Sequence, residues 1–204
     1  NIGALDKGNV ISGWNKAIFA ELTPQTGTVY DLSVQGNILG LSSDGITNSL
    51  GSVGGRGPGG SIPAVNQYGV YVGQGNNIMI GGPQLSLGNI IHSEQTDIYC
   101  EGIWWYGADS KTTISYNRIG VDRNNNLINT DAGIGIQIHK FFNLLSRNRN
   151  RLGILIDHNI IGSRSRQTGI KMDSVMSYFA IEKNTIGAEV NGAAPPGGTY
   201  GKGI

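Results

Sequence analysis

The chain has 204 residues, of which 33 are glycine and 14% are charged, and its net charge at pH 7 is +1. This length suits one large domain, and the near-zero net charge excludes general polyanion binding, so we expect no nucleic-acid partner. The single Cys100 excludes an intramolecular disulfide, no apolar run reaches the length of a membrane span, and recurring aliphatic runs argue against disorder.

One short pattern occurs four times with the same spacing: an aliphatic residue, two polar positions, Asn, any residue, an aliphatic residue and Gly. Its asparagines are Asn37, Asn117, Asn159 and Asn184. The aliphatics alternate with polar residues as in strands, and Asn tolerates the left-handed backbone of a turn. Each copy therefore predicts two short strands joined at a corner. Stacked copies would align Val34, Ile114, Ile156 and Ile181 in one column, and Leu39, Ile119, Ile161 and Ile186 in another.

A second pattern, Gly followed by alternating aliphatics, begins at residues 69, 102, 133, 169 and 203. Its period is therefore near 33 residues, which marks a repeat architecture. Residues 2–12 also resemble residues 80–92, as expected of an internal duplication. No amphipathic helical segment accompanies the repeats, which argues against a leucine-rich repeat. The patterns predict an all-β solenoid of about five to six turns with parallel strands about 4.8 Å apart.

We expect residues 1–204 to form a single β-helix segment, with a Gly-rich surface loop at 49–66 inserted between turns. Both ends of the chain interrupt a repeat, at Asn1-Ile2-Gly3 and at Gly203-Ile204. Solenoids need caps over their terminal strands. The sequence therefore predicts a fragment of a longer chain.

These repeats resemble those of the right-handed parallel β-helix (pectate-lyase-like) superfamily, and in particular those of secreted bacterial β-helix proteins and phage tailspikes. The resemblance covers nearly the whole chain outside the Gly-rich loop. It implies an extracellular, cell-surface or virion location and a long carbohydrate as partner. A tailspike-like protein would be a homotrimer. The superfamily includes lyases, hydrolases, epimerases and adhesins, so the resemblance does not select one reaction.

Side chains between the inward aliphatics of the second pattern should point outward. This places Tyr71, Trp104, Gln137 and Lys171 in one exposed column, with Tyr106 and His139 nearby. Aromatic rings flanked by amides and charges are what sugar rings stack on. We therefore predict a substrate-binding face here. The alternative is that Trp105 faces the core and Trp104 lies under a loop.

Ser115, Asp157 and Glu182 occupy equivalent outward positions in the corner strands, just after the inward aliphatic. Adjacent turns would bring Asp157 and Glu182 within roughly 5 Å. Retaining glycosidases use such carboxyl pairs, so both are candidate catalytic residues. A lyase would instead need a base and positive charge, for which His139, Lys140, His158, Lys171 and Asp173 are available. Ordinary solvated side chains are the alternative in each case.

Arg147, Arg149 and Arg151 alternate with asparagines, and Arg164 and Arg166 follow one strand pair later. Such a cluster would attract carboxylated or sulfated polysaccharide, or else form a solvated loop. No metal-ligand spacing is present among the histidines. The Asp- and Asn-rich turn at 122–126 offers oxygen ligands for Ca²⁺, but turn formation explains its composition better. We expect no cofactor.

The sequence favours a β-helix that recognises a polysaccharide along its side face, with participation in its degradation as an open extension. An enzyme of this kind would be a polysaccharide lyase or a glycoside hydrolase. The alternative is a structural or adhesive stalk without catalytic activity, in which the repeats serve length alone.

Overall fold

The computed structural model describes residues 1–5, 7–21, 29–46, 67–102, 111–128, 133–141, 153–162, 168–175 and 177–187. Within these residues the chain forms β-strands, turns and one 3-10 helix, η1 (Leu85–Leu87), and it contains no α-helix. The Gly-rich loop expected at 49–66 lies outside the described residues.

Most of the described strands belong to three parallel sheets, and a small fourth sheet pairs β3 (Val29–Tyr30) with β7 (Gly75–Asn76). Sheet 1 contains β2 (Lys16–Ala20), β6 (Tyr68–Val72), β10 (Thr96–Glu101), β13 (Ile134–His139) and β16 (Thr168–Asp173). Sheet 2 contains β4 (Ser33–Val34), β8 (Ile78–Gly81), β11 (Thr112–Ser115), β14 (Ile154–Asp157) and β17 (Phe179–Glu182). Sheet 3 contains β1 (Val10–Ile11), β5 (Ile38–Leu39), β9 (Ile90–Ile91), β12 (Arg118–Ile119), β15 (Ile160–Ile161) and β18 (Thr185–Ile186).

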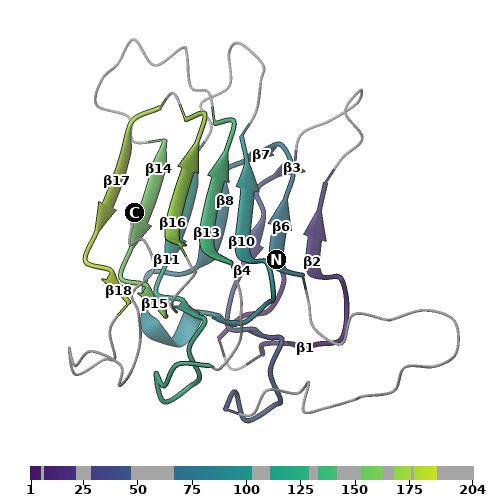
Figure 1. Ribbon diagram of the computed structural model, residues 1–204. Helices are drawn as coiled ribbons and strands as arrows, with labels where there is room; N and C mark the ends of the chain where they lie inside the picture. Colours follow the sequence, from purple (N-terminus) through teal and green to yellow (C-terminus); the bar gives the residue numbers. More distant parts are fainter. Residues whose placement is uncertain are drawn as a thin grey trace, which may run out of the picture.

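From β2 onward the chain passes through sheets 1, 2 and 3 in the same order, and each strand pairs with its equivalents in the previous and next passages. We call one such passage a layer. In Figure 1 the longer strands stand side by side, and the short strands of sheet 3 lie beneath them. The predicted stack of parallel strands is confirmed, and the arrangement is compatible with a solenoid.

The core consists of aliphatic columns that run through the layers. Ile114 pairs in register with Ile156, and Ile156 pairs with Ile181, as the sequence predicted. Ile80 stands between Val34 and Ile114 in the same column. Each fully buried Ile of such a column contributes about 1.5–3 kcal/mol of hydrophobic stabilisation.

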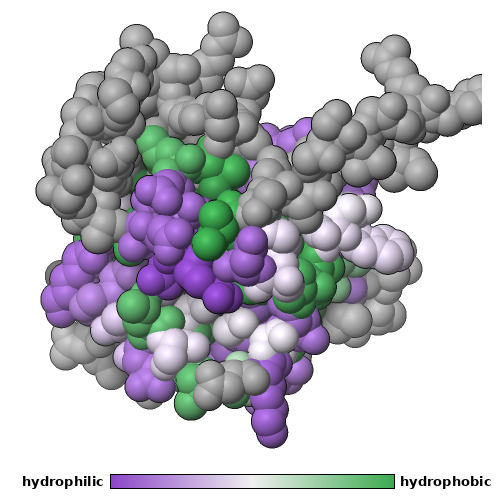
Figure 2. Space-filling model, turned by 90° about the horizontal axis from the view of Figure 1, so that it is seen from below, coloured by the Kyte–Doolittle hydropathy of each residue, from purple (hydrophilic) through white to green (hydrophobic). Residues whose placement is uncertain are grey.

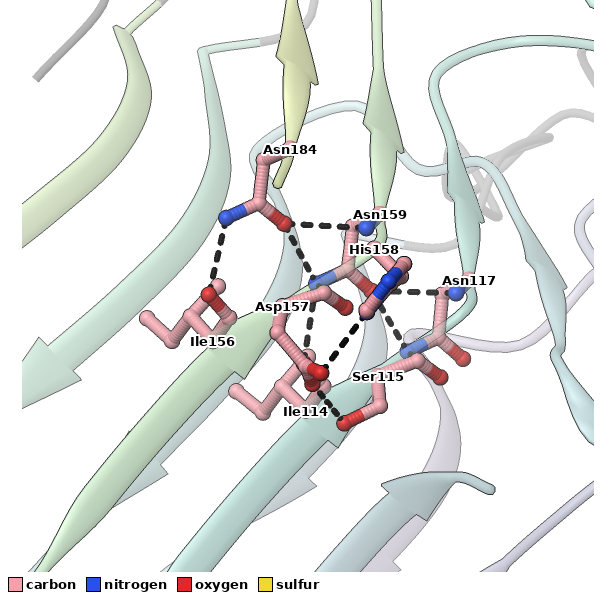
Figure 3. Close-up of polar contacts among 8 residues, drawn as sticks. All are labelled: Ile114, Ser115, Asn117, Ile156, Asp157, His158, Asn159 and Asn184. Carbon is pink, nitrogen blue, oxygen red and sulfur yellow. Dashed lines mark hydrogen bonds and ion pairs between the residues drawn. The ribbon is translucent and has the colours of Figure 1, made fainter. Parts of the chain in front are cut away.

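The corner between sheets 2 and 3 is held by a ladder of side-chain amides. Each Nδ2 donates to the Oδ1 of the next asparagine at 2.9–3.0 Å, in the order Asn9, Asn37, Asn89, Asn117, Asn159 and Asn184. The same Oδ1 atoms also accept the preceding asparagine's backbone N–H at 2.9–3.0 Å. Figure 3 shows the last three members in line, as predicted.

The prediction that the asparagine itself adopts the left-handed backbone of this corner is wrong. The preceding residue adopts it: φ is 59° at Tyr116, 54° at His158 and 56° at Lys183. The asparagine side chain is turned inward instead, where its Nδ2 also donates to a strand carbonyl, such as Ile114 O from Asn159 at 2.8 Å. The left-handed step before Asn117, Asn159 and Asn184 thus places each of these amides inside the corner.

The glycines of the second sequence pattern allow sheets 1 and 3 to approach closely. A Cβ at Gly69 would lie 2.3 Å from Ile91 Cγ2, and one at Gly135 would lie 2.8 Å from Ile161 Cγ2. The register places Asp97 at the equivalent position of β10. One layer therefore carries a carboxyl group where its neighbours carry no side chain.

Candidate functional site

The outward side of sheet 1 carries a row of aromatic residues, which we call the aromatic face: Phe19, Tyr68, Tyr71 and Tyr99. Phe19 pairs in register with Tyr71, and Tyr71 pairs with Tyr99. The Tyr71 and Tyr99 rings stack with centroids 4.7 Å apart and planes 13° apart, whereas Phe19 lies 5.5 Å from Tyr71 at 44°. Tyr68 meets Tyr71 edge-on at 5.3 Å. The rings form one continuous surface across three strands.

The Lys16 ammonium group lies over two rings of the aromatic face. Its Nζ lies 3.8 Å from the Tyr71 ring centroid and 4.0 Å from that of Phe19, which are cation–π distances. Burial, followed by the nearby Glu101 carboxylate, raises the pKa of Tyr99 above its ordinary value. Burial also raises the pKa of Tyr71, with smaller contributions from Glu21, Glu101 and Tyr68. Both phenols therefore stay protonated at neutral pH and can donate hydrogen bonds.

Polar residues continue the same column beyond the rings. Gln137 pairs in register with Tyr99, and Lys171 pairs with Gln137. The next outward column holds Glu101, His139 and Asp173. Asp173 Oδ2 lies 3.2 Å from His139 Nδ1, without hydrogen-bond geometry, and 3.9 Å from Lys171 Nζ. The face therefore changes from aromatic to charged along the stack.

The predicted column is correct for Tyr71, Gln137 and Lys171 but wrong for Trp104. The strand of that layer is Thr96–Glu101, so Tyr99 occupies the place between Tyr71 and Gln137. Trp104 follows the strand and lies outside the described residues, as does Tyr106. Arg147, Arg149, Arg151, Arg164 and Arg166 also lie outside them. Gly102-Ile103 matches the repeat pattern by chance. The strand itself carries Asp97 where the pattern requires glycine, so the pattern does not detect it.

Asp157 and Glu182, the candidate catalytic pair, lie side by side in register on sheet 2. The Asp157 carboxylate is engaged on both oxygens: Ser115 Oγ donates to Oδ1, and His158 Nδ1 lies 2.8 Å from Oδ2 (Figure 3). The His158 ring stacks on Tyr116 with centroids 4.5 Å apart. Glu182 is exposed. The structure thus brings Ser115 and His158 into contact with Asp157 and adds Tyr116 to the pair's surroundings.

A buried polar cluster that the sequence analysis missed lies between β9 and β10. Ser93 Oγ donates to Asp97 Oδ1 at 2.9 Å, and both residues are buried. His92 is 1% exposed, and neither of its ring nitrogens has a hydrogen-bond partner among the described residues. Burial lowers the pKa of His92 to about 4 and raises the pKa of Asp97 well above its ordinary value. The cluster lies in the core, so it bears on stability rather than on a surface reaction.

Turn chemistry explains the Asp- and Asn-rich segment at 122–126. Asp122 Oδ1 accepts the backbone N–H groups of Asn124 and Asn126 at 2.8 Å, and its Oδ2 accepts from Asn126 Nδ2 at 3.0 Å. Both carboxylate oxygens therefore serve the turn itself.

No family model matches the chain, and neither a curated protein nor a solved structure is significantly similar to it. Within the described ranges, none of the helical structure is long and apolar enough to cross a membrane.

Proposed function

We propose that this chain is a right-handed parallel β-helix of the pectate-lyase-like kind that recognises a polysaccharide along its side, outside the cell or on a virion surface. The repeated order of the three sheets and the continuous amide ladder support the coil. A tailspike-like homotrimer is the corresponding expectation for assembly, which sedimentation equilibrium measures.

The aromatic face is the observation that carries the proposed binding. Sugar rings present apolar C–H faces that pack on aromatic surfaces and hydroxyls that exchange hydrogen bonds with nearby polar groups. Phe19 is 53% exposed at one end of the row, and Gln137 and Lys171 continue it in register. An extended chain lying across the strands would meet these groups in succession, one about every 4.8 Å.

Degradation of the bound polysaccharide would depend on Asp157 and Glu182, or on the charged residues of sheet 1. Glu182 is exposed and suits an acid or nucleophile, but Asp157 already bonds Ser115 and His158. A retaining hydrolase would have to release Asp157 from these partners, since its second carboxylate must reach the sugar. A lyase would draw on His139 and Lys171, which flank Asp173 on the other sheet.

One observation favours the structural stalk instead. Tyr71 and Tyr99 stack face to face, so each ring covers a face of the other and both stabilise adjacent layers. Stacked aromatic pairs contribute about 0.5–1.5 kcal/mol beyond their burial. In a stalk, this row would serve cohesion between layers and would bind no sugar.

Glycan-array binding of Phe19→Ala separates the two readings, with Phe179→Ala as a matched control. Both phenylalanines are 53% exposed and lie on edge strands, Phe19 on sheet 1 and Phe179 on sheet 2. Loss of one exposed ring contact of about 1 kcal/mol lowers affinity several-fold. We expect that loss for Phe19→Ala only. Absence of glycan binding by the wild type, or equal loss in both variants, would leave the stalk.

A further inference from the structure

A groove on sheet 3, away from the aromatic face, combines an apolar floor with two arginines. Its volume is about 530 Å³, within the range of small-molecule sites. The floor is formed by Ile38 and Ile90, which are 8% and 7% exposed, and one wall by η1 with Leu85. Arg118 and Arg123 line the groove from the next layer. Figure 2, seen from the lower side of Figure 1, shows strongly hydrophilic side chains beside apolar ones at the centre of its view.

Two turns from different layers fix the arginines. Arg118 Nε donates to Asn125 Oδ1 at 2.8 Å, which leaves the Nη edge of the guanidinium for another acceptor. The Arg123 backbone N–H donates to Gly45 O at 2.7 Å, and a Cβ at Gly45 would lie 3.3 Å from Arg123 Nε. Gly45 has φ of 67°, so its turn depends on the missing side chain. The fold therefore fixes the Arg118 guanidinium through its side chain and holds Arg123 through its backbone.

The local charge balance is positive. Burial, and then the neighbouring Arg123, lower the pKa of Arg118, and the opposite effect of Asp122 does not offset them. Both carboxylate oxygens of Asp122 accept hydrogen bonds from its own turn. Neither arginine is salt-bridged to a carboxylate within the part of the chain that the structure describes. An anion that binds between two like charges at a partly desolvated site lowers the repulsion between them.

We propose that this groove binds a small organic anion, whose carboxylate, sulfate or phosphate group contacts Arg118 and Arg123 while its apolar body lies on Ile38, Ile90 and Leu85. Arginine suits this task because its planar fork matches an oxyanion with two parallel hydrogen bonds. The site is separate from the polysaccharide face and does not depend on it, because the groove lies on sheet 3 and the aromatic face lies on sheet 1.

Isothermal titration calorimetry with cyclohexanecarboxylate, its neutral amide and inorganic sulfate tests the proposal. We expect the carboxylate to bind best, the amide not to bind, and sulfate to bind more weakly because it lacks the apolar body. Arg118→Gln should lower carboxylate affinity roughly tenfold or more, since a hydrogen bond to a charged group is lost. Lys111→Gln removes an exposed positive charge elsewhere and should leave affinity unchanged.

A second pair of variants keeps the test independent of the arginine's structural role. Leu85 is 50% exposed at the groove wall, so Leu85→Asp and Leu85→Asn place side chains of the same shape there that differ in charge. Leu85→Asp should weaken carboxylate binding several-fold more than Leu85→Asn. The site assignment is overturned if no probe binds at millimolar concentration, if the amide binds as well as the carboxylate, or if the Leu85 variants are equal. If sulfate bound as tightly as the carboxylate, the claim that the ligand's apolar body contributes to binding would be overturned.

Discussion

Replacement of Asn159 by alanine removes an interior member of the amide ladder. The side chain donates to Ile114 O at 2.8 Å and to Asn184 Oδ1 at 3.0 Å. Its Oδ1 accepts the backbone N–H and the Nδ2 of Asn117, both at 3.0 Å. Its Nδ2 also donates to Asp157 O at 3.0 Å, so five hydrogen bonds, three of them buried and two partly buried, lose a partner at a residue that is 1% exposed. Because the amide carries only two hydrogens for its three acceptors, the loss is equivalent to about four bonds.

The expected cost is about 4 kcal/mol, because each such bond contributes about 1 kcal/mol net and the abandoned buried groups have no water to replace it. For a chain of this length the midpoint of thermal unfolding should fall by roughly 10 °C. Urea unfolding followed by circular dichroism measures the free energy directly.

Asn9→Ala is the matched control at the end of the same ladder. Asn9 is exposed, and its side chain donates only to Asn37 Oδ1 at 2.9 Å among the described residues. Its loss should cost about 1 kcal/mol or less. If Asn159→Ala destabilises no more than Asn9→Ala, the ladder does not hold the layers together and this reasoning is refuted.

Three further perturbations act on buried titratable groups. Burial lowers the pKa of His92 to about 4 from 6.5, so the unfolded chain is protonated first and stability falls by about 3 kcal/mol as pH drops between these values. His92→Leu should abolish that part of the pH dependence of the free energy of urea unfolding. If wild type and variant lose the same stability between pH 6.5 and 4, the assignment to His92 is refuted. Burial raises the pKa of Asp97, so stability is lost as pH rises above the ordinary 3.8, and Asp97→Asn should stabilise the protein at neutral pH but not near pH 3. Burial raises the pKa of Cys100 to about 12, so its thiol should react with Ellman's reagent only as fast as the chain unfolds, and immediate labelling in buffer would contradict its position.

The corner pattern predicted the stacked strands because it reports a local requirement. A left-handed step and a buried amide must follow the inward aliphatic at fixed spacing, as at Ile114, Tyr116 and Asn117. Asn89 supplies the same buried amide, but it lies nine positions after Ile80 rather than three, and Gly88 before it has φ of −67° instead of a left-handed conformation. The intervening segment contains η1, which broke the spacing and hid this member of the ladder.

The strands of sheet 1 were harder to predict. Their sequence signal is a glycine that is required by close packing against another sheet, and not by the conformation of a turn. In β10 that position is Asp97, and in β2 it is Ala17. Neither strand begins with the expected glycine, so Phe19 and Tyr99 were missed, and Trp104 was given the place of Tyr99. The carboxyl group of Asp97 is buried there, with its pKa raised by burial, and accepts a hydrogen bond from Ser93 Oγ, a contact that no local sequence pattern predicts.

The candidate carboxyl pair shows a third limit. Periodicity placed Asp157 beside Glu182, and the register agrees. It placed Ser115 in the same outward row, but it did not predict that Ser115 and His158 engage Asp157, from the preceding layer and from the adjacent corner. Side-chain partners depend on how layers stack, and that information is not contained in one repeat.

Proton NMR of the aromatic rings during titration with an acidic or neutral oligosaccharide tests the proposed binding face most directly. The account predicts that the resonances of Phe19 and Tyr99 shift on titration, while those of Phe179 on sheet 2 do not move. Shifts confined to Phe179 and its surroundings, or no shift with any saccharide that the protein binds, would contradict the assignment of sheet 1 as the polysaccharide face.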